Sequence, residues 1–356
     1  MQALVRIPIL LRTMLDLIGL PARISKALDR FRREEQRKLS PFAAMAQPGD
    51  ILAILGSPWS TARYASMLER ARREQGVKVL LLVYDLIPLR CPEWCHPGLV
   101  ELFGRWYDTC LPKTDIVLSI SRYSARDLEA YARHSGITLT GTVGTIPIGT
   151  GFGIAATLSD ATSPRPHHLP AAGSYVLFVS TIEPRKNHAL LFRAWRRLLD
   201  DLPSGDVPTL VFAGHVGWLV NDMIQQLHNA QFLGGKIALI ESPSDADLIH
   251  LYKGCLFTLF PSLYEGWGLP VTESLALGKP CIVSNVTSLP EAGGTLARYF
   301  DPDNLNDVVR VIRDTLSDRA GLAEWEARVR RDFRPVSWDA SAQSLLEHAA
   351  LLEPAQ

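Results

Sequence analysis

Short, almost wholly apolar runs alternate along the chain with stretches in which apolar residues recur every three or four positions. The run "VKVLLLVYDLIPL" (77–89) is nearly continuous, as expected of a strand covered by helices on both faces. Residues 61–76 and 122–136 have helical spacing, and each stretch ends at a glycine. This alternation predicts βα units and parallel sheets. The other predicted strands comprise residues 50–56, 115–121, 142–149, 174–180, 209–214, 236–241, 255–262 and 280–285.

A proline-rich break divides this pattern into two series. The stretch "ATSPRPHHLPAAG" (161–173) holds three prolines and two histidines, a composition typical of an interdomain linker. We therefore predict an α/β chain with two doubly wound, Rossmann-like domains facing a cleft, over residues 41–160 and 174–335. In such sheets ligands bind beyond the carboxyl ends of the strands. That rule directs attention to the loops after residues 180, 214, 262 and 284.

Two predicted helices have an apolar face. The face of the helix over 187–202 comprises Leu190, Leu191, Ala194, Trp195, Leu198 and Leu199. The stretch "FRPVSWDASAQSLLEHAALL" (333–352) is also typical of an amphipathic helix, and we assign residues 336–356 to a separate C-terminal helical segment. Its predicted apolar face comprises Trp338, Ala342, Leu345, Leu346 and Ala349.

Residues 1–40 concentrate positive charge at one end of the chain. Within residues 1–38 there are nine Lys/Arg and four acids, whereas the whole chain has 37 of each kind. The segment either lies on an anionic membrane surface or forms a solvated helix packed on the first domain. Arginines interrupt its apolar stretch, which argues against a secretory signal. The sequence has no run of about 18 uncharged apolar residues, so no membrane span is predicted.

The overall composition excludes some partners and sites. A net charge of zero argues against a nucleic-acid binder, whose affinity would rest on a basic surface. The five cysteines form no CxxC pair, which favours reduced thiols in a cytoplasmic protein. Asp245 and Asp247, like Asp301 and Asp303, match an Asp-x-Asp metal pattern. The first pair opens a predicted helix and the second is typical of a turn, so we predict no metal site.

The loop after residue 180 combines two cations with the start of a helix. In "STIEPRKN", Arg185 and Lys186 directly precede Asn187, a residue type favoured as an N-cap. Side-chain charge and the positive end of a helix dipole together suit a phosphate group. The alternative is an exposed basic pair with no ligand.

The stretch "SLYEGWGLPVTESLALGKPCIVS" (262–284) holds two glutamates eight residues apart. Gly266 and Gly268 let backbone N–H groups approach a ligand, and a helix is predicted over about 270–277, with its proline in the first turn. Glu273 is predicted in that first turn, where it either complements the helix dipole or holds a ribose diol. Glu265 lies in the loop itself, and its alternative is an exposed acid.

At these residues the sequence resembles the retaining glycosyltransferases of family 4. The likeness rests on "FPSLYEGWGLPVTESLALGKPCIVSNVTSLPEAGG", on "VSTIEPRKNHALLFRAW" and on "SPSDADLIHLYKGC". Further matches are "LVYDLIPLRCPEW", "SISRYSARDL" and "IPIGTGF", in the family's order over about residues 50–350. The resemblance implies the GT-B fold, with an acceptor-side domain at 41–160, a donor domain at 174–335 and a C-terminal helix that crosses back to the first domain.

The resemblance also implies roles for individual residues. Glu265 would contact the hydroxyls of the donor sugar, helped by the backbone of Gly266, Trp267, Gly268 and Leu269. Glu273 would bind the ribose of the nucleotide. Arg185 and Lys186 would neutralise the diphosphate as it leaves. Retention in this family is usually explained by front-face attack guided by that phosphate, so neither glutamate need be a nucleophile.

Two features depart from the family's pattern. Members often carry His-Asp-Leu where this chain has Tyr84-Asp85-Leu86, and a tyrosine with a pKa near 10 is a poor base at neutral pH. Asp85 is our candidate for a polar contact to the acceptor or donor sugar, and its alternative is a turn residue. Members also open with a strand and a glycine-rich loop, neither of which residues 1–40 show. We expect that loop to be missing, rebuilt or truncated.

These expectations define one function and two alternatives. We expect retaining transfer of a hexose, mannose by resemblance to bacterial mannosyltransferases, from a nucleotide-diphosphate sugar with GDP-mannose favoured. The expected acceptor is a glycan or polyprenyl-diphosphate-linked oligosaccharide, reached at the inner face of the cytoplasmic membrane, with no cofactor. A same-fold epimerase or phosphorylase is one alternative, although a phosphorylase would carry pyridoxal phosphate on a lysine that we do not identify. A non-catalytic nucleotide-sugar-binding scaffold is the other.

Overall fold

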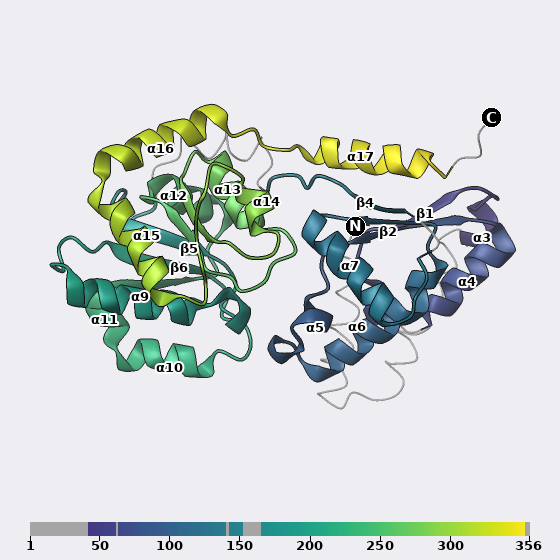
Figure 1. Cartoon of the computed structure of the whole chain (residues 1–356), viewed down its shortest axis with the longest axis horizontal. Coiled ribbons are helices and arrows are strands. Elements are labelled where there is room, and N and C mark those ends of the chain that lie inside the picture. Colours follow the sequence, from purple (N-terminus) through teal and green to yellow (C-terminus); the bar gives the residue numbers. More distant parts are fainter. Residues whose placement is uncertain (1–41, 62, 140–141, 152–164, 353–356) are drawn as a thin grey trace, which may run out of the picture. The chain divides into compact units, whose positions relative to one another are not determined.

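The computed structural model describes residues 42–61, 63–139, 142–151 and 165–352 (Figure 1). The predicted basic segment over 1–40 lies outside these residues, as do residues 161–164 of the predicted linker, so the expectation about the glycine-rich loop also falls outside them. The remainder of that linker packs on the domain that follows it. Arg165 donates to the carbonyls of Pro170 and His250, and Leu169 is buried.

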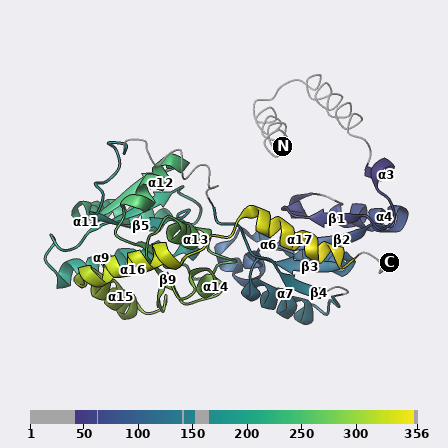
Figure 2. The ribbon, with the colours of Figure 1, turned by 90° about the horizontal axis from the view of Figure 1, so that it is seen from above.

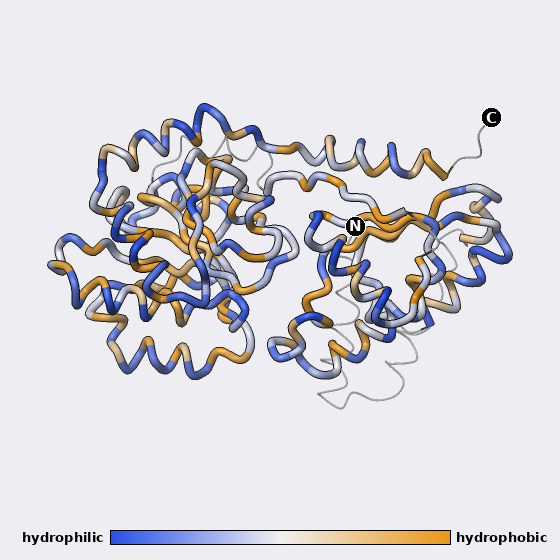
Figure 3. The backbone as a smooth tube through the Cα atoms, viewed as in Figure 1, coloured by the Kyte–Doolittle hydropathy of each residue, from blue (hydrophilic) through white to orange (hydrophobic). Residues whose placement is uncertain are grey.

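The first sheet has four parallel strands in the order β1–β2–β3–β4. They are β1 (Ile51–Ile54), β2 (Lys78–Val83), β3 (Ile116–Ser119) and β4 (Thr142–Thr145). The two central strands, β2 and β3, are apolar and buried through most of their length, as parallel strands covered on both faces should be (Figure 3). The outer strands differ, because β1 is only partly buried and β4 has the sequence TVGT. The helices of this part are α3 (Phe42–Met45), α4 (Tyr64–Gln75), α5 (Ile87–Arg90), α6 (Pro97–Cys110) and α7 (Arg122–His134).

The predicted strand over 77–89 is too long. The strand ends at Val83, and the short helix α5 begins at Ile87 because the Asp85 carboxylate accepts a hydrogen bond from the Ile87 N–H at 3.0 Å. The apolar run continues beyond the strand, through a turn and into a short helix. Hydrophobic periodicity alone cannot distinguish such a run from a longer strand.

The second sheet has six parallel strands in the order β10–β9–β8–β5–β6–β7. Counted from its own first strand, β5, this is the 3-2-1-4-5-6 order of the Rossmann fold. The order reverses between β5 and β8, which are neighbours through Leu177 and Thr258. The strands are β5 (Tyr175–Val179), β6 (Thr209–Gly214), β7 (Ile237–Glu241), β8 (Thr258–Phe260), β9 (Cys281–Ser284) and β10 (Arg298–Phe300).

Helices supply the rest of this core. They are α9 (His188–Asp201), α10 (Asn221–Asn229), α11 (Gln231–Gly235), α12 (Asp245–Gly254), α13 (Leu269–Ala276), α14 (Leu289–Gly293), α15 (Leu305–Ser317) and α16 (Arg319–Asp332). The apolar face predicted for α9 is confirmed, because Leu190, Leu191 and Trp195 are fully buried against Phe178 and Phe212. Packing of this face against the core holds the first turn of α9 in position, and with it the loop that precedes the helix.

The C-terminal helix α17 (Trp338–Ala350) lies against the first sheet (Figure 2). Leu345 and Ala349 pack with Ile146 and Ile148, which confirms that the helix returns to the first domain. The predicted apolar face is wrong in part, because Trp338 is 52% exposed and Leu346 is 60% exposed. Small and polar side chains instead fill the buried face, and a Cβ at Gly144 would come within 3.0 Å of His348. The helix approaches the strand so closely at this point that small side chains, and not the large apolar ones, occupy the contact.

Buried His188 makes the stability of this fold depend on pH. It is the first residue of α9 and lies between the rings of Phe178 and Phe212, and burial lowers the pKa of its imidazole to about 3. The unfolded chain takes up this proton near pH 6.5, so the native state loses stability as pH falls below that value. Between pH 6.5 and 4.5 we expect His188→Phe to lose about 2–3 kcal/mol less than the unaltered chain.

Urea unfolding at a series of pH values checks this expectation. The exposed His134 provides a matched His→Phe control, which should retain the acid sensitivity of the unaltered chain. Parallel losses of stability in the unaltered chain and in His188→Phe would contradict the assignment.

Candidate functional site

The reversal of strand order in the second sheet brings together two loops that are eighty residues apart in the sequence. The chain leaves β5 through a 3₁₀ turn, Pro184–Lys186, and leaves β8 through residues 261–268. The N–H of Leu263 donates to the carbonyl of Arg185 at 2.9 Å, which ties the two loops directly. The structure therefore joins the loops at the point where a doubly wound sheet binds its ligand.

The charged side chains of these loops form one cluster. Arg185 Nη1 lies 2.8 Å from Glu265 Oε2, and Lys186 Nζ lies 2.6 Å from Glu265 Oε1. Arg185 Nη2 also donates to Glu183 Oε1 at 2.5 Å. All four side chains are at most 15% exposed. The alternative of an exposed basic pair is therefore wrong, as is that of an exposed acid at Glu265.

The cluster fixes the charge state of Glu265. Burial alone raises the pKa of its carboxyl, but the Lys186 and Arg185 charges outweigh burial and hold the pKa at about 2. Glu265 is therefore an anion at neutral pH, able to accept hydrogen bonds but unable to donate a proton. Two carboxylates and two cations give the cluster no net charge. The cations are held in place by carboxylate partners, so they need little rearrangement to meet an anionic ligand.

Asn187 occupies the N-cap position of α9, as predicted, but its geometry there is unusual. Asn187 has a left-handed backbone with φ +59°, a region that asparagine tolerates, and its side chain makes no capping bond. It directs the chain from the 3₁₀ turn into α9, which presents Arg185 and Lys186 before the helix starts.

The loop before α13 leaves backbone donors available. Among the described residues, no protein acceptor is found for the N–H groups of Gly266, Trp267, Gly268 and Leu269. The loop is nevertheless well anchored, because the Ser288 hydroxyl donates to the carbonyls of Glu265 and Trp267, both at 2.8 Å. Gly268 has φ +132° and would bring a Cβ within 2.9 Å of Leu289, so glycine is required there. A run of N–H groups ahead of a helix favours an anionic or hydroxylated ligand.

Glu273 lies deeper in α13 than predicted. It is the fifth residue of the helix, in the second turn, because the helix begins one residue earlier than expected, at Leu269. Simple complementation of the helix dipole is therefore a poor explanation, since that effect falls off after the first turn. Burial raises the pKa of the Glu273 carboxyl, and Oε2 accepts a hydrogen bond from the Tyr252 hydroxyl at 3.0 Å. The backbone of Gly151 lies against the same carboxylate, where any Cβ would clash.

Asp85 lies beyond the carboxyl end of β2, in the first sheet. Its Oδ1 caps the start of α5, which fits the turn role that we left open. Burial raises the pKa of its carboxyl. Tyr84 donates its hydroxyl to the carbonyl of Leu55 at 2.9 Å and is 40% exposed.

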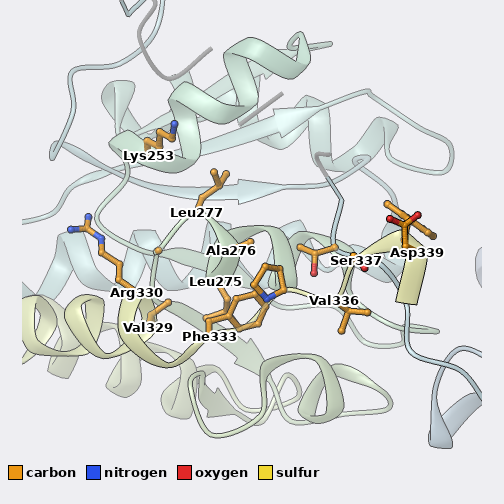
Figure 4. Close-up of a pocket in the computed structure, with 14 residues that line it drawn as sticks. Lys253, Leu275, Ala276, Leu277, Val329, Arg330, Phe333, Val336, Ser337 and Asp339 are labelled. Atoms are coloured by element: carbon orange, nitrogen blue, oxygen red, sulfur yellow. The ribbon is translucent and has the colours of Figure 1, made fainter. Parts of the chain in front are cut away.

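A large cavity lies away from the charged cluster. It has a volume of about 570 Å³ and is lined by the last turn of α13 together with side chains between 329 and 339, including Arg330, Phe333 and Val336 (Figure 4). Glu265, Gly266 and the free N–H groups lie at the opposite, amino-terminal end of α13. The cavity and the charged cluster thus lie at opposite ends of α13.

The two Asp-x-Asp matches have local explanations. Asp247 forms a capping box with Ser244 at the start of α12, and Asp301 accepts from the Asp303 N–H in a turn. Over residues 42–61, 63–139, 142–151 and 165–352, no group of three or more His, Cys, Asp or Glu side chains is placed to hold a metal ion. No helix in these ranges is long and apolar enough to cross a membrane.

Comparison with known proteins identifies the fold and a matching family. HepE from Anabaena, solved in complex with UDP, superposes with a TM-score of 0.58 over 85% of this chain and 77% of its own, at 16% identity. The chain has the GT-B fold. Within it, residues 160–332 match the family described as Glycosyl transferases group 1, a range that includes all of the charged cluster.

Two curated relatives come from Escherichia coli. The serotype-specific mannosyltransferase WbdA is 28% identical over 295 residues, which cover 80% of this GT-B chain and 35% of WbdA. The O-antigen chain mannosyltransferase B is 33% identical over 165 residues, which cover 46% of this chain and 42% of that protein. The chain thus spans about a third of the length of WbdA.

Sequence reasoning missed several residues that support the site. Glu183 holds Arg185, Tyr252 holds Glu273, and Ser288 holds the glycine loop. Glu183 adjoins "PRKN" and was detectable as a third charge in the same turn. Tyr252 and Ser288 gave no such signal, because they meet the site only through tertiary packing.

Proposed function

We propose that this chain transfers a hexose, with retention, from a nucleotide-diphosphate sugar to a glycan or polyprenyl-diphosphate-linked acceptor. The observation that carries the proposal is the cluster of Arg185, Lys186 and Glu265 at the strand-order reversal, beside four N–H groups for which the described residues supply no acceptor. Two fixed cations and a run of backbone donors suit a diphosphate, and a permanently ionised carboxylate suits sugar hydroxyls.

The chemistry explains why cations are needed at this position. The bond between C1 of the sugar and the leaving phosphate oxygen breaks as the acceptor hydroxyl oxygen bonds to C1 on the same face. The hydroxyl proton passes to the departing phosphate. Negative charge therefore develops on the diphosphate, where Arg185 and Lys186 would stabilise it. Glu265 would hold the sugar and keep both cations aligned.

Mannose and GDP are our choice of sugar and nucleotide. The two curated relatives carry mannosyltransferase in their names, and this supports mannose for the present chain. HepE, solved with UDP, supports a nucleotide diphosphate in general. A thermal-shift panel with GDP, UDP, ADP and dTDP tests the nucleotide. At 100 times its Kd the right nucleotide adds about 2.7 kcal/mol of stability. We expect GDP to give the largest shift, and no shift with any of the four would refute the donor site.

Glu273 is proposed to bind the ribose. Glu273→Ala removes a charged acceptor of two hydroxyls, a change worth roughly 1.5–3 kcal/mol, so nucleotide affinity should fall at least tenfold. Tyr252→Phe is the matched variant, because it keeps the carboxylate and removes only the hydroxyl that holds it. It should cost roughly two- to tenfold. Titration calorimetry with GDP measures both, and unchanged affinity in Glu273→Ala would count heavily against the ribose assignment.

We further propose that the enzyme acts at the inner face of the cytoplasmic membrane, where a polyprenyl-linked acceptor is presented. The nine Lys/Arg of residues 1–38 support an attraction to anionic lipid. Sedimentation with phosphatidylglycerol vesicles tests this proposal. Binding should weaken as salt is raised, and equal binding to neutral phosphatidylcholine vesicles would contradict it.

A further inference from the structure

Three hydroxyl groups from the loop after β9 hold the loop that follows β8. The two strands are parallel neighbours in the second sheet, so both loops leave the sheet at the same edge. The Ser284 hydroxyl donates to the carbonyl of Ser262 at 2.6 Å. The Ser288 hydroxyl donates to the carbonyl of Glu265 at 2.8 Å, and the Thr287 hydroxyl oxygen accepts from the Glu265 N–H at 3.0 Å. Two of the three bonds therefore act on Glu265.

Both polar groups of the Glu265 backbone are thus held by consecutive residues, Thr287 and Ser288. Apart from the Thr287 oxygen, the described residues supply no acceptor for the Glu265 N–H. The carboxylate of the same residue is held separately, by Arg185 and Lys186. Because the side chain extends from this backbone, a shift at the N–H would move the carboxylate relative to the two cations and to a bound sugar.

Thr287 has a backbone conformation that threonine rarely adopts. Its φ is +54°, in the left-handed region, where a side chain branched at Cβ is a genuine outlier. Over residues 42–61, 63–139, 142–151 and 165–352, no other threonine, valine or isoleucine has a φ in this region. Glycine adopts this conformation without strain, so a turn that required only the φ value would favour glycine. What threonine supplies and glycine lacks is the hydroxyl that binds the Glu265 N–H.

We propose that Thr287 is a positioning residue, whose hydroxyl holds the Glu265 carboxylate where it meets the hydroxyls of the donor sugar. The left-handed turn directs this hydroxyl toward the Glu265 N–H, so the strain at residue 287 serves the geometry of the site. In this role Thr287 needs no contact with the sugar or the nucleotide. The inference rests on the proposed function, because that function makes the sugar the ligand of Glu265.

Three substitutions of Thr287 separate the hydroxyl from the turn. Thr287→Val keeps the branched shape and removes the hydroxyl, so kcat for transfer from GDP-mannose to methyl α-D-mannobioside should fall roughly 10- to 100-fold. Thr287→Ser keeps the hydroxyl and should recover most of the rate. Thr287→Gly removes the hydroxyl but relieves the strain, so it should be at least as stable as Thr287→Val and equally slow. Urea unfolding measures the stability of each variant.

Binding of the intact donor gives a second measurement, which does not depend on turnover. Titration calorimetry with GDP and with GDP-mannose isolates the contribution of the sugar. Thr287→Val and Thr287→Gly should leave the affinity for GDP unchanged and weaken that for GDP-mannose roughly two- to tenfold. Thr295→Val is the matched control at an exposed threonine just beyond α14, and it should leave both affinities and kcat unchanged.

Several results would overturn the proposal. They are normal kcat and GDP-mannose affinity in a folded Thr287→Val protein, full activity in Thr287→Gly, and an equal loss of affinity for GDP and GDP-mannose. Full activity in Thr287→Gly would make Thr287 a turn residue only, and an equal loss would assign it to the nucleotide.

The same measurements separate this proposal from the proposed function. If the unaltered chain binds GDP-mannose but transfers no sugar, the proposed function fails. Weaker binding of GDP-mannose alone in Thr287→Val would then still support the placement of Glu265 by Thr287. Absence of binding of both GDP and GDP-mannose to the unaltered chain would defeat the two proposals together.

Discussion

Replacing Arg185 with alanine is expected to lower kcat for sugar transfer by roughly 10²- to 10³-fold, the usual cost of removing one preorganised charge at a transition state. Arg185 is 13% exposed and is held between Glu183 and Glu265, so its guanidinium stays in position before the donor arrives. Because the negative charge on the diphosphate grows as the C1–O bond breaks, the loss should fall mainly on kcat and less on the affinity for nucleotide.

Two further variants make this result interpretable. Arg185→Lys keeps a positive charge but cannot reach both carboxylates with a planar fork, so it should recover only part of the rate. Arg193→Ala, at an exposed arginine on α9, is the matched control and should leave kcat unchanged. Nucleotide release, coupled to acceptor glycosylation, measures all three. A kcat within threefold of normal in a folded Arg185→Ala protein would remove Arg185 from the mechanism.

Glu265→Gln is expected to separate nucleotide binding from turnover. The change takes the cluster from zero net charge to one positive charge, and it frees Arg185 and Lys186 from their anionic partner. Affinity for GDP should therefore stay constant or rise. Turnover should fall by at least 10²-fold, because the sugar loses a charged acceptor and the cations lose the group that aligns them.

Calorimetry with GDP and steady-state kinetics together test this separation. Glu324→Gln, at an exposed glutamate of α16, is the matched control for the loss of one negative charge. If GDP affinity and turnover fell together in Glu265→Gln, the carboxylate would be serving the nucleotide rather than the sugar. If neither changed, the charged cluster would be a structural ion pair only.

The two loops of the candidate site were predictable from the sequence, because the loop signals and the switch-point rule indicated the same positions. "EPRKN" after a buried strand and "EGWGLP" before a helix are both loop signals that follow strands. The switch-point rule for doubly wound sheets then predicts that such loops bind a ligand. Sequence patterns within each loop could not predict that charged side chains of the two loops form ion pairs with each other. Glu265 pairs with both Arg185 and Lys186, which becomes visible only when β5 and β8 lie side by side.

Other features depended on packing alone. The apolar run after Val83 continues through a turn because Leu86 and Pro88 are buried, so its hydrophobicity gave no sign that the strand had ended. On α17 the buried face is made of small and polar residues that fit against Gly144, while Leu346 is exposed and the half-exposed Trp338 lies against Gly149. Hydrophobic periodicity predicts which face of a helix is apolar. Which residues of that face are buried depends on how closely the helix packs against the neighbouring strands.

The central claim is that the charged cluster binds a nucleotide-diphosphate sugar and promotes transfer of its hexose to the acceptor. The most direct measurement incubates the chain with GDP-mannose and a methyl α-D-mannobioside and follows GDP release and the product by NMR. The account predicts GDP release that depends on the mannobioside, an α-linked product, and a rate lowered at least 10²-fold in Arg185→Ala. Bound nucleotide without acceptor-dependent release from GDP-, UDP-, ADP- or dTDP-sugars would contradict it.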